Sequence, residues 1–311
     1  MTGAIFDIVL CLLILAVALA AILGRDLFGS VVFFIVYGLL VALAWTRLGA
    51  VDVALAEAAI GAGLTGVLLV GAVARLRRGG VVEPTPPRPL ARGAQMGICV
   101  LAAGLVGAAI AGLDPDAAGL TATVAQNLEA SGVGNPVTAV LLNFRGYDTL
   151  LETVVLLVVL IGVWSLAEDR YWGGRPGLRQ HAKPGGVLAT YGRFLPPLGL
   201  LAGVYVVWAG TDQPGGAFQG GTILAAVWLL VAMAGLVDAP PVTARRLRLT
   251  IVAGPALFLA VAVAGIFMGG FLHLPPEHAK QLIQTIEAGL ALSIAATLAL
   301  LVAGPPQRGA R

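Results

Sequence analysis

The sequence predicts an all-α polytopic integral membrane protein with about nine transmembrane helices. Of its 311 residues, 59% are hydrophobic and only 11% are charged, whereas a soluble domain carries about 25% charged residues. The mean hydropathy is +0.94. The apolar runs are continuous and not alternating, which favours helices over a β-barrel. This composition excludes a soluble globular protein and a disordered chain. With only two cysteines, both in apolar runs, it also excludes a disulfide-stapled domain.

A transmembrane helix needs about 20 mostly apolar residues, and nine windows of the chain meet this requirement. In order they are residues 4–23, 27–45, 50–74, 94–112, 149–167, 192–209, 215–237, 249–272 and 279–302. The first is not a cleavable signal peptide, because no Lys or Arg precedes it and its apolar run is too long. The long stretch before the fifth window contains a short apolar piece, residues 136–142, which we expect to be re-entrant or interfacial.

The basic residues predict an orientation for these spans. With nine spans, the loops after the odd-numbered ones share one side of the membrane. Of the 19 Lys and Arg residues, only Arg47, Arg145 and Lys280 fall on the other side. Because cytoplasmic loops collect Lys and Arg, we expect the amino terminus outside and the carboxyl terminus in the cytoplasm. The basic pI is therefore a sign of topology, and no nucleic-acid partner is expected.

Two cytoplasmic loops look like joints between modules. Residues 82–89, VEPTPPRP, form a stiff proline-rich linker. Residues 171–184 are rich in Gly and Arg and have no periodic pattern. The joints divide the chain into a three-span module (residues 1–80), a two-span module (81–170) and a four-span module (171–311).

Three glutamates lie inside the expected spans, where a charged side chain is costly and marks a functional candidate. Glu57, Glu152 and Glu287 each lie about six to eight residues, or roughly 9 to 12 Å, below the outer surface. They are candidate ion-translocation residues. The alternative is that they are protonated or hydrogen-bonded contacts that fasten helices together.

Acidic residues nearer the surface precede two of these glutamates. Asp52 comes five residues before Glu57, and Asp148 comes four residues before Glu152. Helical spacing places Arg145, Asp148 and Glu152 on one stripe, so Arg145 can pair with Asp148. A surface acid followed by a deeper one is the arrangement that a proton or cation entry path requires.

Residues 211–221, TDQPGGAFQGG, form an unusual external turn between two spans. Proline followed by four glycines in seven residues gives a tight turn and a helix end that a neighbour can approach closely. We expect a packing or subunit contact there; the alternative is an ion-facing helix terminus. The residues concerned are Pro214, Gly215, Gly216, Phe218, Gln219, Gly220 and Gly221.

Nothing in the sequence indicates autonomous catalysis. It contains no nucleophile–base pair, Walker motif, haem signature or iron–sulfur cysteine cluster. Residues 61–66 match G-x-G-x-x-G, but they lie inside an expected membrane helix with no preceding strand, so their glycines more plausibly allow close helix packing. We expect a transporter subunit with no cofactor and no bound metal centre.

The acidic motifs resemble those of antiporter-related membrane complexes. Residues 52–63, DVALAEAAIGAG, resemble the DVALTEAAVGAG signature of D-type subunits of membrane-bound hydrogenase antiporter modules. Residues 144–152, FRGYDTLLE, resemble the FRGYDTLGE signature of E-type subunits. Both modules also form the tail of the A subunit of Mrp-type sodium/proton antiporters. Residues 214–221, PGGAFQGG, are similar to the PGGGFQGG region of the Mrp-type B subunit.

The resemblance implies a fusion of D-like, E-like and B-like modules with the same boundaries as above. It implies an integral subunit of a multisubunit antiporter in the prokaryotic cell membrane, in contact with large antiporter-like subunits and handling H⁺ and Na⁺. The alternatives are a membrane-arm subunit of a hydrogenase-like, redox-driven ion pump related to complex I, and a non-conducting scaffold. The chain's departures from the motifs include Ala56, Leu151 and Ala217. The missing Thr hydroxyl at position 56 leaves the handling of Na⁺ beside Glu57 open.

Overall fold

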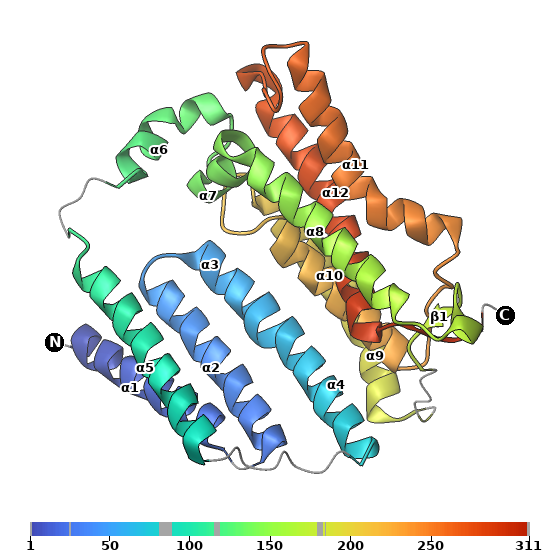
Figure 1. Cartoon of the computed structure of the whole chain (residues 1–311). Helices are drawn as coiled ribbons and strands as arrows, with labels where there is room; N and C mark the ends of the chain where they lie inside the picture. Colours follow the sequence, from blue (N-terminus) through green and yellow to red (C-terminus); the bar gives the residue numbers. More distant parts are fainter. Residues whose placement is uncertain are drawn as a thin grey trace.

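The computed structural model describes residues 2–24, 26–80, 89–114, 119–178, 183 and 185–309. Figure 1 shows an all-helical arrangement of long, roughly parallel or antiparallel rods. Of the two expected joints, residues 82–88 of the proline-rich linker lie outside the described residues. The same holds for residues 179–182 and 184 of the second joint.

The first part of the chain forms three long helical rods. They are α1 (Thr2–Leu23), α2 (Leu27–Arg47) and a continuous rod made of α3 (Val51–Ala56), the π-helix η1 (Glu57–Leu64) and α4 (Thr65–Arg78). Asp26 caps α2, because its side chain accepts a hydrogen bond from the backbone N–H of Gly29. α2 packs against α1 on one side and against the α3–η1–α4 rod on the other.

The middle of the chain alternates long and short helices. They are α5 (Pro89–Ala111), α6 (Thr121–Asn127), η2 (Glu129–Ser131), α7 (Pro136–Thr138), the π-helix η3 (Ala139–Phe144) and α8 (Gly146–Ser165). α8 packs on the last two long helices, whereas none of the spanning part of α5 is buried. In Figure 1, the α3–η1–α4 rod lies between α5 and α8.

The last part of the chain forms a four-helix group closed by a small sheet. Its elements are η4 (Asp169–Tyr171), β1 (Arg175–Pro176), α9 (Val187–Ala209), α10 (Ala217–Met233), α11 (Arg245–Ile266), α12 (Pro276–Ala303) and β2 (Pro306–Arg308). α10 packs against α9 and α12, and α11 packs against α12. β1 pairs antiparallel with β2, so the end of the chain is fastened beside the second joint.

Helix α12 is the centre of the core. Two thirds of its spanning window is buried, against 6% for α1. Ile283, Ile286 and Leu290 are fully or almost fully buried, and α8, α10 and α11 all cover this helix. Close approach depends on glycine: a Cβ at Gly254 of α11 would lie 2.9 Å from the Leu290 Cα and from a backbone oxygen of α12. A buried, apolar helix in this position organises the others around it.

The helices confirm the all-α polytopic class, with one difference in span length. Eight helices in the described part of the chain are long and apolar enough to cross a membrane. The seventh expected span, residues 215–237, is the shorter helix α10 of 17 residues. It is shorter because its glycine-rich start belongs to the preceding turn and its carboxyl end stops before Gly235, which has a positive φ of 69°. Residues 136–142 do not span; Ala139 and Leu142 are buried in the core.

The two ends of the helical rods differ in chemistry. The amino ends of α3, α8 and α12 gather at one end with the α9–α10 turn (Figure 1). The other end carries the basic residues: Arg308 forms an ion pair with Asp238, and the guanidinium of Arg75 lies beside Gly304. This grouping is the one that the loop charges predict. The assignment of the basic end to the cytoplasm stays a prediction.

Candidate functional site: a polar junction at the α9–α10 turn

The turn that joins α9 to α10 is the point where three distant parts of the chain meet. It runs from Gly210 to Gly216, and its last two residues have φ angles of 155° and 132° at Gly215 and Gly216. Residues other than glycine rarely adopt these angles. The backbone N–H of Gly216 donates to the carbonyl of Val206, which folds the turn back on α9. This fold leaves the N–H of Gly215 free to bind another segment.

That segment is the start of α3, and the binding group is Asp52. Oδ1 of Asp52 accepts a hydrogen bond of 2.9 Å from the backbone N–H of Gly215. The amide of Asn135 donates weakly to both carboxylate oxygens, at 3.4 and 3.5 Å, and Gln219 donates to the Asp52 carbonyl at 3.4 Å. Asp52 is only 8% exposed. The expectation of a surface acid is therefore wrong, because the α9–α10 turn and Asn135 cover it.

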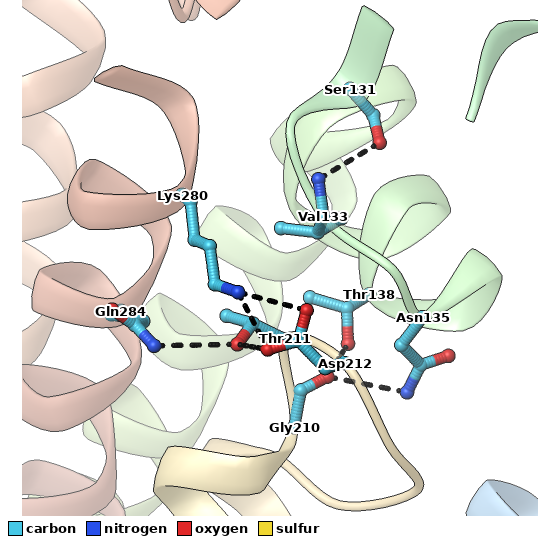
Figure 2. A network of polar contacts seen from close by, with 9 residues as sticks. All are labelled: Ser131, Val133, Asn135, Thr138, Gly210, Thr211, Asp212, Lys280 and Gln284. Carbon is cyan, nitrogen blue, oxygen red and sulfur yellow. Dashed lines mark hydrogen bonds and ion pairs between the residues drawn. The ribbon is translucent and has the colours of Figure 1, made fainter. Parts of the chain in front are cut away.

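The loop before α8 binds the same turn from another side, as Figure 2 shows. Thr138 donates to the carbonyl of Gly210 at 2.6 Å, and Asn135 donates to the Gly210 carbonyl at 3.2 Å and to that of Gln213 at 3.0 Å. The backbone N–H groups of Gly134 and Asn135 both donate to the carbonyl of Thr211 at 2.9 Å. Asn135 also caps α7 through Oδ1, so its one side chain serves both the helix and the junction.

Helix α12 supplies the third side of the junction. Nζ of Lys280 donates to both carboxylate oxygens of Asp212, at 2.9 and 2.7 Å, and Gln284 donates to the Thr211 hydroxyl at 3.4 Å (Figure 2). The hydrogen bond from Lys280 is the main reason why the pKa of Asp212 lies below its usual value of 3.8. Lys280, Gln284 and Glu287 occupy positions i, i+4 and i+7, so they form one stripe that runs inward from the helix end.

Glu287 is the innermost member of that stripe and is 3% exposed. The backbone N–H of Ala217, the first residue of α10, is close enough to act on its carboxyl group. Its Oε2 atom has no hydrogen-bond partner in the described part of the chain. Asp52 is near enough for its charge to act on Glu287. Two acidic side chains predicted in separate modules thus lie at the same glycine turn, Asp52 at Gly215 and Glu287 beside Gly216.

Glu57 lies outside this junction. It begins η1 and is half-buried, with Oε1 placed beside Gly38 of α2 and Gly61 of its own rod. A Cβ at Gly61 would overlap this oxygen, so the glycine makes room for the carboxyl group. A π-helical turn at a buried acid is typical of functional positions. Within the described residues, the Glu57 carboxyl group has no hydrogen-bond or ion-pair partner.

Glu152 lies on an uncovered face of α8. Arg145 and Asp148 form the expected i,i+3 ion pair, with 2.7 Å between Nη2 and Oδ2, but both are largely exposed. Glu152 is also exposed. Its intrachain surroundings therefore differ from those of Glu57 and Glu287. The sequence predicts similar depths for the three glutamates, but their environments in the structure are different.

The glycine motif packs against its own chain. A Cβ at Gly220 would overlap Val207 of α9, and one at Gly221 would lie 2.9 Å from the Ile294 side chain of α12. Phe218 packs against the main core. Pro214 is exposed in the turn and does not begin a helix, because α10 starts at Ala217. The expected close approach is present inside the chain; a contact with another subunit stays a prediction.

Sequence reasoning missed most of the side chains that complete the junction. They are Asn135, Thr138, Thr211, Asp212, Lys280 and Gln284. Two signals could have found some of them: Asn135 directly precedes Pro136, which is typical of a helix start, and Lys280 is one of the few basic residues at the acidic end. The described residues contain no group of three or more His, Cys, Asp or Glu side chains that could hold a metal ion.

The fold and the junction define a multi-pass α-helical membrane protein whose first and last parts are joined through buried polar contacts. Two family models match the corresponding parts of the chain. Residues 12–78 match the MbhD model, which describes the D-type subunit of MBH. Residues 187–305 match the model described as a domain related to the MnhB subunit of Na⁺/H⁺ antiporter. The chain therefore joins an MbhD-type part to an MnhB-type part in one protein of the prokaryotic cell membrane.

The chain is also similar to chains in two solved structures. The chain is similar to a chain in the structure of the Mrp complex from Dietzia sp. DQ12-45-1b, with 25% identity and a TM-score of 0.73. The match covers 97% of this chain and 35% of that one. The fold also resembles a chain of the membrane-bound sulfane sulfur reductase, an archaeal respiratory complex, with 24% identity and a TM-score of 0.54 over 68% of this chain and 98% of that one.

The uncharacterized protein MJ1307 of Methanocaldococcus jannaschii is 31% identical over 156 residues. That alignment covers 43% of this chain and 57% of the relative, so the match spans little more than half of the curated protein. Its printed name assigns no activity.

Proposed function

We propose that the chain is an integral membrane subunit of a multisubunit Mrp-type monovalent cation (Na⁺)/proton antiporter. It contributes an acidic ion path and contacts to large antiporter-like subunits, and acts as a transporter subunit rather than as an enzyme. The observation that carries the proposal is the match of 97% of the chain to a chain of the Dietzia Mrp complex. The MnhB-related part, residues 187–305, supports the same class of complex.

The uncovered surface of the chain supports the presence of partners. None of the spanning part of α5 is buried, and α1 is almost entirely exposed. On α8, the exposed Glu152 lies one turn beyond the Asp148–Arg145 ion pair. A charged side chain in contact with lipid is costly, and such residues normally face protein or a water-filled cavity. Partner subunits that cover α8 would supply that environment.

The proposed ion path uses Glu57 and Glu152 as the conducting acids, with Asp148 and Arg145 at the surface end of α8. Glu57 supports a conducting role through its half-buried place on a π-helix and its lack of an intrachain partner among the described residues. The coupling ions are H⁺ and Na⁺. The amino terminus lies outside and the basic loops lie in the cytoplasm, with module boundaries at residues 80 and 170.

A second candidate is a membrane-arm subunit of a hydrogenase-like, redox-driven pump related to complex I. The match of residues 12–78 to the MbhD model favours it. The third candidate is a scaffold, in which the acids only fasten helices; the buried bond between Asp52 and Gly215 is the observation in its favour.

The experiment that separates the first two is purification of the tagged chain from its native membrane in mild detergent, followed by mass spectrometry of the bound proteins. We expect large antiporter-like subunits without redox proteins. Iron–sulfur or nickel–iron subunits in stoichiometric amount would assign the chain to a redox-driven pump. Recovery of the chain alone would contradict both complex-based proposals.

A further inference from the structure

The junction brings to one turn two candidate ion-translocation residues that the sequence predicts in separate modules. Asp52 comes from the MbhD-type part and Glu287 from the MnhB-type part, and both are more than nine-tenths buried. Asp52 is held by the Gly215 N–H and the Asn135 amide, so its orientation is fixed. Oε1 of Glu287 lies beside Gly216, while its buried Oε2 atom has no partner among the described residues.

An unpartnered, buried carboxyl oxygen points to a missing ligand. Burial of a charge without a partner is strongly unfavourable, and two carboxylates that act on each other make the cost larger. The nearest cation of the stripe, Lys280, is already bound to Asp212 at the exposed end. A proton or a metal cation from outside the chain is therefore needed to balance the pair.

The space around Gly216 supplies oxygen ligands for such a cation. The point where a Cβ of Gly216 would lie is 3.0 Å from Oε1 of Glu287 and 3.3 Å from Oε1 of Gln219. A carboxylate oxygen and an amide oxygen thus both face Gly216, on the side where any other residue would carry its Cβ atom. Hard monovalent and divalent cations prefer ligands of this oxygen type.

Polar side chains lie on α12 between Glu287 and the outer end of the helix. Gln284 lies between Lys280 and Glu287 on the α12 stripe and binds the Thr211 hydroxyl, and the partly exposed pair of Lys280 and Asp212 lies at its outer end (Figure 2). These polar side chains line the face of α12 between its exposed end and Glu287. The charge of Asp52 also acts on Glu287.

We propose that Asp52 and Glu287, together with Gln219 and the backbone around Gly216, form a binding site for one exchangeable monovalent cation at the junction of the two parts. The cation is a proton or Na⁺, and it is reached from the helix end along Lys280 and Gln284. The inference deepens the proposed transport function, on which its physiological role rests, by adding an acid site distinct from Glu57 and Glu152.

The test is chemical labelling of the full chain in native membrane vesicles. Dicyclohexylcarbodiimide, an apolar reagent that modifies protonated buried carboxyl groups, is applied over a range of pH in NaCl or in choline chloride. Mass spectrometry of the digested chain then measures the modification of Glu287. We expect labelling that falls as the pH rises. If Na⁺ is the ligand, labelling also falls about tenfold when Na⁺ reaches about ten times its Kd, because only the free site reacts.

Substitutions make the test specific. Asp52→Asn and Gln219→Leu should each weaken protection by Na⁺, or shift the pH dependence of Glu287 labelling if the ligand is a proton. Glu277→Gln, at an exposed position of the same helix, is the matched control and should change neither. Gly216→Ala, which places a Cβ into the site, should reduce protection; a membrane-inserted chain with unchanged labelling at Glu57 shows that it still folds.

Two results would overturn the proposal. One is the absence of labelling at Glu287 under every condition while Glu57 is labelled; the other is labelling that depends on neither pH nor Na⁺. Because labelling is read on this chain, either result is distinguishable from a failure to find antiporter partners by co-purification.

Discussion

The carboxylate of Asp52 accepts a 2.9 Å hydrogen bond from the backbone N–H of Gly215, which lies 163 positions later in the chain. The bond joins the start of α3 to the α9–α10 turn and thus links the MbhD-type part to the MnhB-type part. This hydrogen bond helps to fix the position of one part relative to the other, although a proline-rich stretch lies between them in the sequence. It also removes Asp52 from the surface, where a collecting acid would have to lie.

Replacing Asp52 by Ala should destabilise the chain by about 1–3 kcal/mol, because it leaves the buried Gly215 N–H without its acceptor. Asp52→Asn keeps one acceptor oxygen and should cost less. Thermal unfolding in detergent measures both. Asp169→Ala, at an exposed position, serves as the control; equal melting temperatures for Asp52→Ala and this control would show that the junction bond adds no stability.

The ion pair of Asp212 and Lys280 should make stability depend on acid pH. The hydrogen bond from Lys280 lowers the pKa of Asp212 below 3.8. The ion pair therefore stabilises the folded state above pH 3.8, and this stabilisation is lost as the pH falls through the lowered pKa of Asp212. Both side chains are nearly half exposed, which limits the contribution to about 1 kcal/mol or less.

Melting temperatures of the wild type and of Asp212→Asn, measured from neutral pH downward, test this dependence. The difference between them should shrink once the pH falls below 3.8. High salt should reduce it as well. A difference that grows on acidification would contradict the assignment.

The crossing of α11 and α12 should be sensitive to one added methyl group. A Cβ at Gly254 would lie 2.8 Å from the Ser293 Cβ and 2.9 Å from backbone atoms of α12. Backbone cannot move aside easily, so Gly254→Ala should cost about 1–3 kcal/mol through overpacking. Gly104→Ala in α5, where nothing lies within 4 Å, should be neutral or slightly stabilising. A similar melting temperature for the two variants would refute the close crossing.

Neutral substitution of the two candidate conducting acids should separate transport from assembly. Glu57→Gln and Glu152→Gln should each lower Na⁺/H⁺ exchange in vesicles by about tenfold or more, which corresponds to about 1.4 kcal/mol on the rate-limiting barrier. Co-purification of partner subunits should stay unchanged. Full exchange activity in both variants would favour the scaffold.

The space beside Glu57 offers an independent test of that acid. A Cβ at Gly61 would overlap Oε1 of Glu57 and push the carboxyl group aside. We expect Gly61→Ala to reduce exchange while Gly71→Ala on the same rod, where nothing lies within 4 Å, does not. The comparison is made at equal amounts of assembled complex. Equal activities would show that the position of the Glu57 carboxyl group does not matter for transport.

Much of the fold could be predicted because its cause is local. Continuous apolar runs of sufficient length give membrane helices, and eight of the nine expected spans are long helices in the described residues. The i,i+3 pairing of Arg145 with Asp148 is present because helical geometry alone brings the two side chains together. Length and spacing along one helix are properties that the sequence expresses directly.

The environments of the acids could not be predicted in the same way. The sequence predicts similar depths for Glu57, Glu152 and Glu287, yet in the structure they are half-buried, exposed and 3% exposed. Glu287 also lies further from its helix start than the other two, because α12 begins at Pro276. The difference arises from which neighbour covers each face: α10 packs over Glu287 on α12, while Glu152 stays exposed on α8. Such coverage depends on contacts between segments that are distant in the sequence.

By itself, the sequence determined the membrane class, the places of eight of the nine expected spans and the segregation of the basic loops, since these follow from composition and period along the chain. Only the tertiary structure decided that Asp52 and Glu287 lie at the same turn, beside Gly215 and Gly216. A turn with two positive φ angles brings a backbone N–H from the MnhB-type part against a carboxylate of the MbhD-type part. That geometry depends on the packing of α3, α10 and α12 together, which no local pattern encodes.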